Sequence, residues 1–79
     1  MEPGTKVRFT MSNLGAIDPE NPYRFHPEVR AMIGDVGTVK GPHPTVEGWD
    51  IVEINWLPPG ALTTEVWEIP VNPHHYEVV

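Results

Sequence analysis

Hydrophobic and polar residues alternate along several short segments of the chain, and a period of two residues predicts β-strands. Residues 6–10 show the pattern first, with Val7 and Phe9 between polar neighbours. Residues 49–56 show it most clearly, because Val52, Ile54 and Trp56 share one phase of the alternation. Further strands are expected over residues 34–40, 64–69 and 76–79. The chain is therefore expected to be all-β.

Prolines and glycines separate these segments and mark turns between them. Asn72 followed by Pro73 is typical of a helix start, so a short helical turn is expected before the last strand. Between residues 34 and 40, Val36 and Val39 do not alternate, and Gly37 lies between them. A glycine in this position predicts a β-bulge or the close approach of another backbone.

A long connection without a regular pattern spans residues 11–33. Its Asp-Pro, Asn-Pro and His-Pro pairs are turn or extended signals. Residues 27–32 are expected to form one helical turn, with Pro27 at its first position. Connections of this length are usually functional or packed on their own side chains. The candidates for such packing are Leu14, Ile17, Tyr23 and Phe25.

This order of elements resembles the SH3-like barrel. Residues 34–39 are similar to the glycine-containing strand of KOW barrels, nitrile-hydratase-β-like barrels and small phage or bacterial barrels. Ile69-Pro70 followed by Tyr76 is similar to the ending of SH3 domains, although the ALYDY motif of peptide-binding members is absent after Phe9. The resemblance implies one domain over residues 1–79, a small five-stranded SH3-like barrel with residues 11–33 as an RT-type first loop.

Composition narrows the classes of function. The 79 residues contain no cysteine, which is compatible with a reducing compartment, and no apolar run near the about 20 residues needed to cross a bilayer. We therefore expect no membrane association and a cytoplasmic location, in the host cytoplasm if the chain is phage-encoded. The net charge of −6 argues against nucleic-acid binding, which needs clustered Lys and Arg.

The cations are confined to the first half of the sequence, so the hairpin over residues 49–69 carries only acidic, polar and apolar side chains. If Val52 and Ile54 face inward, then Ile51, Glu53 and Glu68 face outward, and Trp49 continues that face. Such a surface is either an ordinary solvated face or a mixed apolar and acidic patch that binds a basic protein surface.

The SH3 resemblance implies a second arrangement of candidate residues. Trp49, Pro70 and Tyr76 would line an exposed apolar groove, and Asp18 and Glu20 in the first loop would meet an Arg or Lys of the ligand. An aromatic-walled groove suits a proline-rich segment, because a polyproline II helix is already ordered before it binds. The same aromatic rings could instead surround a cationic group.

Catalysis and metal binding find little support in the sequence. His74 and His75 are adjacent, so their side chains diverge, and no further ligand stands at helical spacing from them. No nucleophile or phosphate-binding motif is present. We expect no catalytic residues, no metal site and no cofactor, and therefore no enzyme.

The leading hypothesis is a small non-enzymatic module that binds a protein partner with a basic or proline-rich surface. Its candidate partner-binding residues are Asp18, Glu20, Trp49, Ile51, Glu53, Glu68, Pro70 and Tyr76. A second hypothesis is a structural subunit, such as a minor virion or assembly component, that forms a homo-oligomer. A third is a KOW-like nucleic-acid-binding barrel that uses Lys6, Arg8, Arg24, Arg30 and Lys40.

Overall fold

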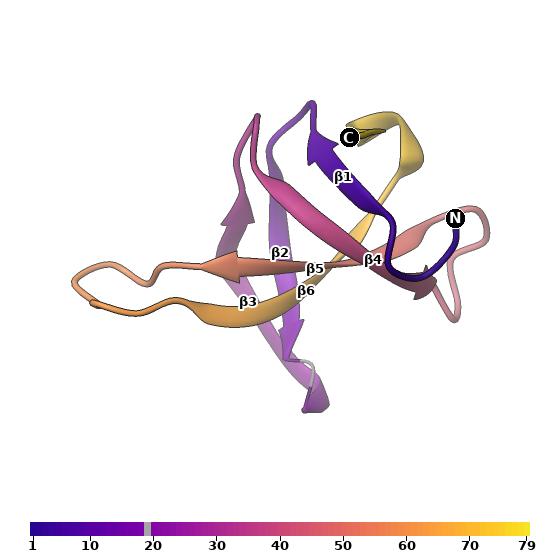
Figure 1. Ribbon diagram of the computed structural model, residues 1–79. Helices are drawn as coiled ribbons and strands as arrows, with labels where there is room; N and C mark the ends of the chain where they lie inside the picture. The colour runs from indigo at the N-terminus through magenta and orange to yellow at the C-terminus, as the bar shows by residue number, and fades with distance from the viewer. Residues whose placement is uncertain (19) are drawn as a thin grey trace.

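Seven antiparallel strands form one sheet in the computed structural model, which describes residues 1–18 and 20–79. The strand order is β3-β2-β6-β5-β4-β1-β7 (Figure 1). Along the chain the strands are β1 (Lys6–Phe9), β2 (Asn13–Asp18), β3 (Asn21–Ala31), β4 (Val36–Pro42), β5 (Asp50–Trp56), β6 (Glu65–Val71) and β7 (Tyr76–Val78). The predicted all-β class is confirmed. Within the described residues, no helix has the length and hydropathy needed to cross a membrane.

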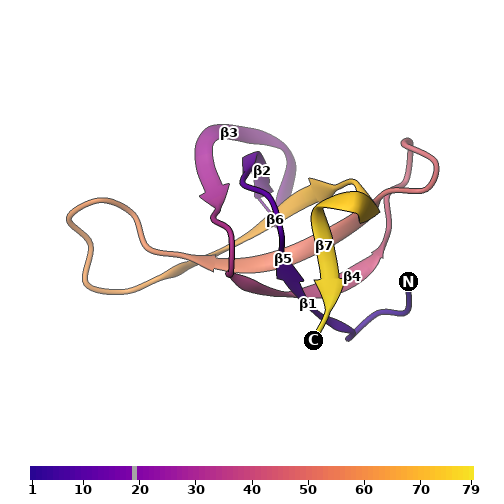
Figure 2. The same ribbon diagram turned by 90° about the horizontal axis from the view of Figure 1, so that it is seen from above.

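One hydrophobic core receives side chains from every strand. The sheet curves around it, so that the β2–β3 hairpin at one end and the β1–β7 pair at the other contribute to the same cluster (Figure 2). The buried residues are Val7, Phe9, Ala16, Val29, Ala31, Val39, Val52, Ile54, Trp67, Ile69, Val71 and Tyr76. The alternation of β5 and β6 is thereby explained, because Val52 and Ile54 of β5 and Trp67, Ile69 and Val71 of β6 enter this core at every second residue.

Five predicted strands are confirmed, with ends shifted by one or two residues. The predicted helical turn is also confirmed as the 3₁₀ turn η1 (Pro73–His75), which lies directly before β7. Its N-cap is Asn72, whose side-chain oxygen accepts a hydrogen bond from the backbone N–H of His74 at 3.0 Å. A capping asparagine followed by proline therefore marked the turn correctly.

The five-stranded closed barrel was the wrong detail, because the sheet has seven strands and is open. Residues 11–33 are not a long irregular loop: they contain the paired strands β2 and β3. The helical turn expected over residues 27–32 is also wrong, since most of that stretch belongs to β3. Pro22 and Pro27 gave the misleading signal, and both lie in an edge strand, where a missing backbone N–H is tolerated.

Gly37 in β4 confirms the predicted close approach of another backbone. A Cβ atom at this residue would lie 2.9 Å from the carbonyl oxygen of Glu53 and 2.5 Å from Cγ1 of Val52. The register shift of the β4–β5 pair falls farther along, between Val39 and Gly41. Only a residue without a side chain fits at Gly37 while β5 keeps its present position.

Candidate functional site

The side of the β5–β6 hairpin opposite the core gathers four of the sequence-predicted site residues. Ile51 pairs directly with Pro70, and Glu53 pairs directly with Glu68. We call this surface the outer face and define it by Ile51, Glu53, Asn55, Val66, Glu68 and Pro70. Residues that are directly opposite in an antiparallel pair point to the same side of the sheet, so these six side chains lie together.

Neighbouring strands extend the outer face on both sides. Ile17 of β2 pairs with Glu68, and Thr38 of β4 pairs with Glu53. The Nζ atom of Lys40 lies 3.4 Å from Oε2 of Glu53. The acidic pair is therefore bordered by an apolar residue on the β2 side and by one cation on the β4 side.

The two carboxylates of the outer face differ in their surroundings. Partial burial raises the pKa of Glu68; the positive charge of Lys40 opposes this shift, and the negative charge of Glu53 adds to it. Like charges directly opposite in a sheet destabilise the pair. The sheet thus carries a repulsive contact at the centre of an otherwise regular hairpin.

Removing the charge of Glu68 is expected to stabilise the isolated protein near neutral pH. Because the pKa of Glu68 is raised on folding, its stabilising contribution is present at low pH and is lost as the pH rises through the folded pKa. We expect Glu68→Gln to increase the free energy of unfolding by about 0.5 kcal/mol at pH 7. The gain should vanish below about pH 4, where the wild-type carboxyl is protonated.

Thermal unfolding of wild type and Glu68→Gln measures this difference in stability. A range from about pH 3 to about pH 8 brackets the titration of a glutamate. Glu47→Gln is the matched control, because Glu47 is an exposed loop residue outside the sheet. A lower stability of Glu68→Gln at pH 7 would contradict the expectation, since the attraction of Glu68 to Lys40 would then outweigh burial and repulsion.

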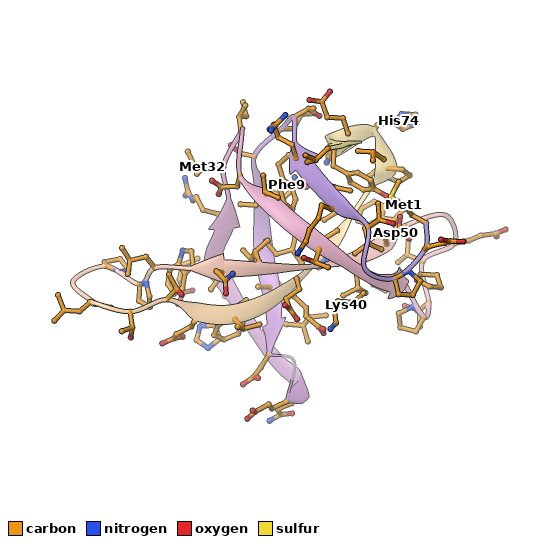
Figure 3. All side chains as sticks on the ribbon, viewed as in Figure 1. Met1, Phe9, Met32, Lys40, Asp50 and His74 are labelled. Atoms are coloured by element: carbon orange, nitrogen blue, oxygen red, sulfur yellow. The ribbon has the colours of Figure 1, made fainter. Side chains whose placement is uncertain are left out.

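A cleft of about 360 Å³ lies at the end of the sheet where β4 ends and β5 begins. Its lining residues are Met1, Pro42, Gly48, Trp49, Asp50, Pro73 and Tyr76. Figure 3 labels Met1 and Asp50, which lie side by side where the N-terminal segment passes the end of β4. Aromatic rings and prolines supply most of the wall, and Asp50 supplies a carboxylate.

Asp50 is almost fully buried, with 5% of its surface exposed. Its Oδ2 accepts a hydrogen bond from the Tyr76 hydroxyl, and the backbone ammonium of Met1 lies 3.5 Å from Oδ1. Burial raises the pKa of the Tyr76 phenol, and the hydrogen bond to Asp50 and the charge of Asp50 raise it further. Tyr76 therefore remains a protonated hydrogen-bond donor throughout the physiological range.

The predicted site residues fall into three places. Trp49 and Tyr76 meet in the cleft, whereas Pro70 lies opposite Ile51 on the outer face. Asp18 and Glu20 lie at the turn between β2 and β3, where the backbone N–H of Glu20 donates to Oδ1 of Asp18 at 2.9 Å. Neither acid lines the cleft.

Sequence reasoning missed Asp50, although the sequence contains a signal for it. Asp50 shares the inward phase of Val52 and Ile54, so an acid occupies a core position of the clearest strand. A charged residue at an inward position predicts a specific partner, because burying a carboxylate raises the free energy of the folded state unless the carboxylate is paired.

The loop between β5 and β6 forms an arm that projects from the body of the molecule (Figure 1). Residues 57–64 carry no charge, and 99% of the surface of Leu62 is exposed. Among the described residues, no group of three or more His, Cys, Asp or Glu could hold a metal ion. Comparisons with protein-family models, with curated proteins and with solved structures find no match to this chain.

Proposed function

We propose that this chain is a small non-enzymatic binding module whose outer face binds a basic surface of a partner protein. The direct pairing of Glu53 with Glu68 carries the proposal. Repulsion between these carboxylates opposes their pairing and Lys40 counters it, and a partner's cationic side chain placed between them would add to the attraction. Binding of such a partner would therefore relieve the repulsion between Glu53 and Glu68 that remains in the free protein.

The apolar members of the outer face favour a protein as the partner. Ile51 with Pro70 on one side and Val66 on the other flank the acidic pair. Apolar area next to charged groups is the composition of protein–protein interfaces, in which apolar contact supplies affinity and charge supplies orientation. The net charge of −6 opposes approach to nucleic acid, so a basic protein is the better match.

Lys40 does not block such a partner. It is half-exposed, and its ion pair with Glu53 lies at the surface. Exposed ion pairs of this kind contribute only about 0–1 kcal/mol, so a partner cation can replace Lys40 at low cost. The outer face therefore holds its carboxylates in place without neutralising both of them.

An SH3-like fold is part of this proposal, and the order of elements supports it. A hairpin, β2–β3, follows the first strand at the position of the RT loop. The β4–β5–β6 meander comes next, and η1 precedes the last strand. The last strand pairs with the first.

The double variant Glu53→Lys/Glu68→Lys tests the proposed function. Immobilised wild type and variant are incubated with an extract of cells that express the protein, and bound proteins are quantified by mass spectrometry. We expect the variant to lose basic partners by at least about tenfold, because two attractive charges become repulsive. Undiminished capture would remove the outer face from the interface.

Glu2→Lys/Glu47→Lys is the matched control, since it makes the same change in net charge at two exposed residues outside the strands. It should capture the same partners as wild type. An equal loss in this control would show that overall charge, and not the outer face, governs binding. Circular dichroism of both variants verifies that the sheet is retained.

A further inference from the structure

Asp50 presents a buried negative charge at the wall of an open cleft. Its exposed fraction is 5%, yet it lines the cleft together with Trp49 and Tyr76. Burying a carboxylate is unfavourable unless a cation or strong hydrogen bonds compensate for the lost water. The hydrogen-bond and charge partners of Asp50 therefore indicate which kind of ligand group this cleft can bind.

The two carboxylate oxygens of Asp50 have different partners. Oδ2 accepts the hydrogen bond of the Tyr76 hydroxyl, which is neutral. Oδ1 is 3.5 Å from the Met1 ammonium, which is longer than the about 2.8 Å of a charge-assisted hydrogen bond. The carboxylate thus has one filled side and one side at which a cation is only loosely held.

The remaining lining residues suit the apolar stem of a cationic side chain. Trp49, Tyr76, Pro42 and Pro73 carry no charge, and Trp and Tyr rings attract cations through their faces. The volume of about 360 Å³ falls within the range of small-ligand sites. A long side chain could therefore lay its methylene groups along the rings while its charged end reaches Asp50.

We infer that this cleft is a recognition site for a lysine side chain of another protein, with Asp50 as the counter-ion and Trp49 and Tyr76 as aromatic walls. An arginine would pair with both oxygens of a carboxylate, but Tyr76 already occupies Oδ2. An ammonium needs only one oxygen, and an ammonium group already lies beside Oδ1. The site is separate from the outer face and does not depend on the proposed function of that face.

Titration of the ¹⁵N-labelled protein with the blocked peptide Ac-Ala-Ala-Lys-Ala-Ala-amide tests the inference. We expect saturable chemical-shift changes at Trp49, Asp50 and Tyr76. The peptide with norleucine in place of lysine should leave these signals unchanged, and the arginine peptide should bind more weakly. Equal responses to lysine and norleucine, or shifts centred on Glu53 and Glu68, would overturn the inference.

Asp50→Asn isolates the charge, because the asparagine carbonyl still accepts the hydrogen bond of Tyr76. It should weaken binding of the lysine peptide by about tenfold or more. Trp49→Leu provides a second test that leaves the carboxylate intact, and it should also weaken binding because it removes one aromatic wall. Unchanged affinity in folded Trp49→Leu would overturn the role of this wall. Glu28→Gln is the control and should bind as wild type does, because Glu28 is an exposed acid of β3 that belongs neither to the cleft nor to the outer face. Unchanged affinity in a folded Asp50→Asn protein would overturn the role of Asp50.

A Gly-Ser dipeptide placed before Met1 moves the backbone ammonium away from Asp50. We expect this extended protein to bind the lysine peptide more tightly than wild type, because the competing ammonium is removed. Loss of binding in the extended protein would contradict the inference, since the Met1 ammonium would then be part of the site. All variants are first compared with wild type by their ¹H–¹⁵N spectra.

Discussion

Replacing Phe9 by alanine is expected to lower the free energy of unfolding by about 4 kcal/mol. Phe9 is 1% exposed and points from β1 into the core, between the two ends of the curved sheet (Figure 3). Proteins have total stabilities of about 5–15 kcal/mol, so the variant should lose a large share of its stability. Urea denaturation followed by tryptophan fluorescence measures the change.

Phe25→Ala is the matched control, because Phe25 is the second phenylalanine of the chain and 61% of its surface is exposed. Its ring lies over Gly15, where a Cβ atom would be only 2.8 Å from its Cζ. This contact predicts a modest loss of about 1 kcal/mol. Equal losses for the two variants would contradict the assignment of Phe9 to the core.

Adding one methyl group at Gly37 is expected to cost about 3 kcal/mol. The Cβ atom of Gly37→Ala would lie within van der Waals overlap of Val52 Cγ1, at 2.5 Å, and of the Glu53 carbonyl oxygen, at 2.9 Å. Because one of these atoms belongs to the backbone of β5, a change of rotamer cannot relieve the overlap completely. The β4–β5 pair must therefore separate, and the same denaturation experiment measures the loss.

A double-mutant cycle with Val52→Ala separates overlap from a general weakening of the strand. Val52→Ala alone removes core packing and should destabilise the protein. It also removes Cγ1, so the double variant should be more stable than the sum of the single losses by about 1 kcal/mol. Simple additivity would indicate that the overlap with Val52 is not the cause.

Alternation along β5 and β6 allowed much of the fold to be predicted from sequence. Val52 and Ile54 enter the core as expected, and Glu53 and Glu68 face away from it. Register between the strands could be anticipated as well, since a slip of one residue would bury the acids. A clear alternation with one buried face therefore predicts the strand and the side that each residue faces without knowledge of residues far away in the sequence.

The β2–β3 hairpin could not be predicted in this way. Pro22 and Pro27 argue against a regular strand when they are considered locally, and Gly15 interrupts the pattern of β2. Their compatibility with the sheet depends on which strand lies at its edge, and strand order is a property of the whole fold. The strand number was therefore underestimated, while the strand class was correct.

The candidate site residues also divide into those that a local pattern could place and those that it could not. Pairing across one hairpin placed Glu53 beside Glu68, because the two strands are neighbours in the chain. The cleft joins Asp50 with Tyr76 and the N-terminal residue, which are far apart in sequence. Only the curvature of the open sheet around the core brings these segments together, so the cleft could not be derived from local pattern.

The edges of the open sheet have a consequence for behaviour at high concentration. Open edges invite pairing with another molecule and thereby aggregation. In β3 the prolines interrupt the row of N–H donors that a second chain would need, and β7 offers only three residues. Pro22 and Pro27 argued against a strand in the sequence, and in the folded chain they disfavour polymerisation through the exposed backbone of β3.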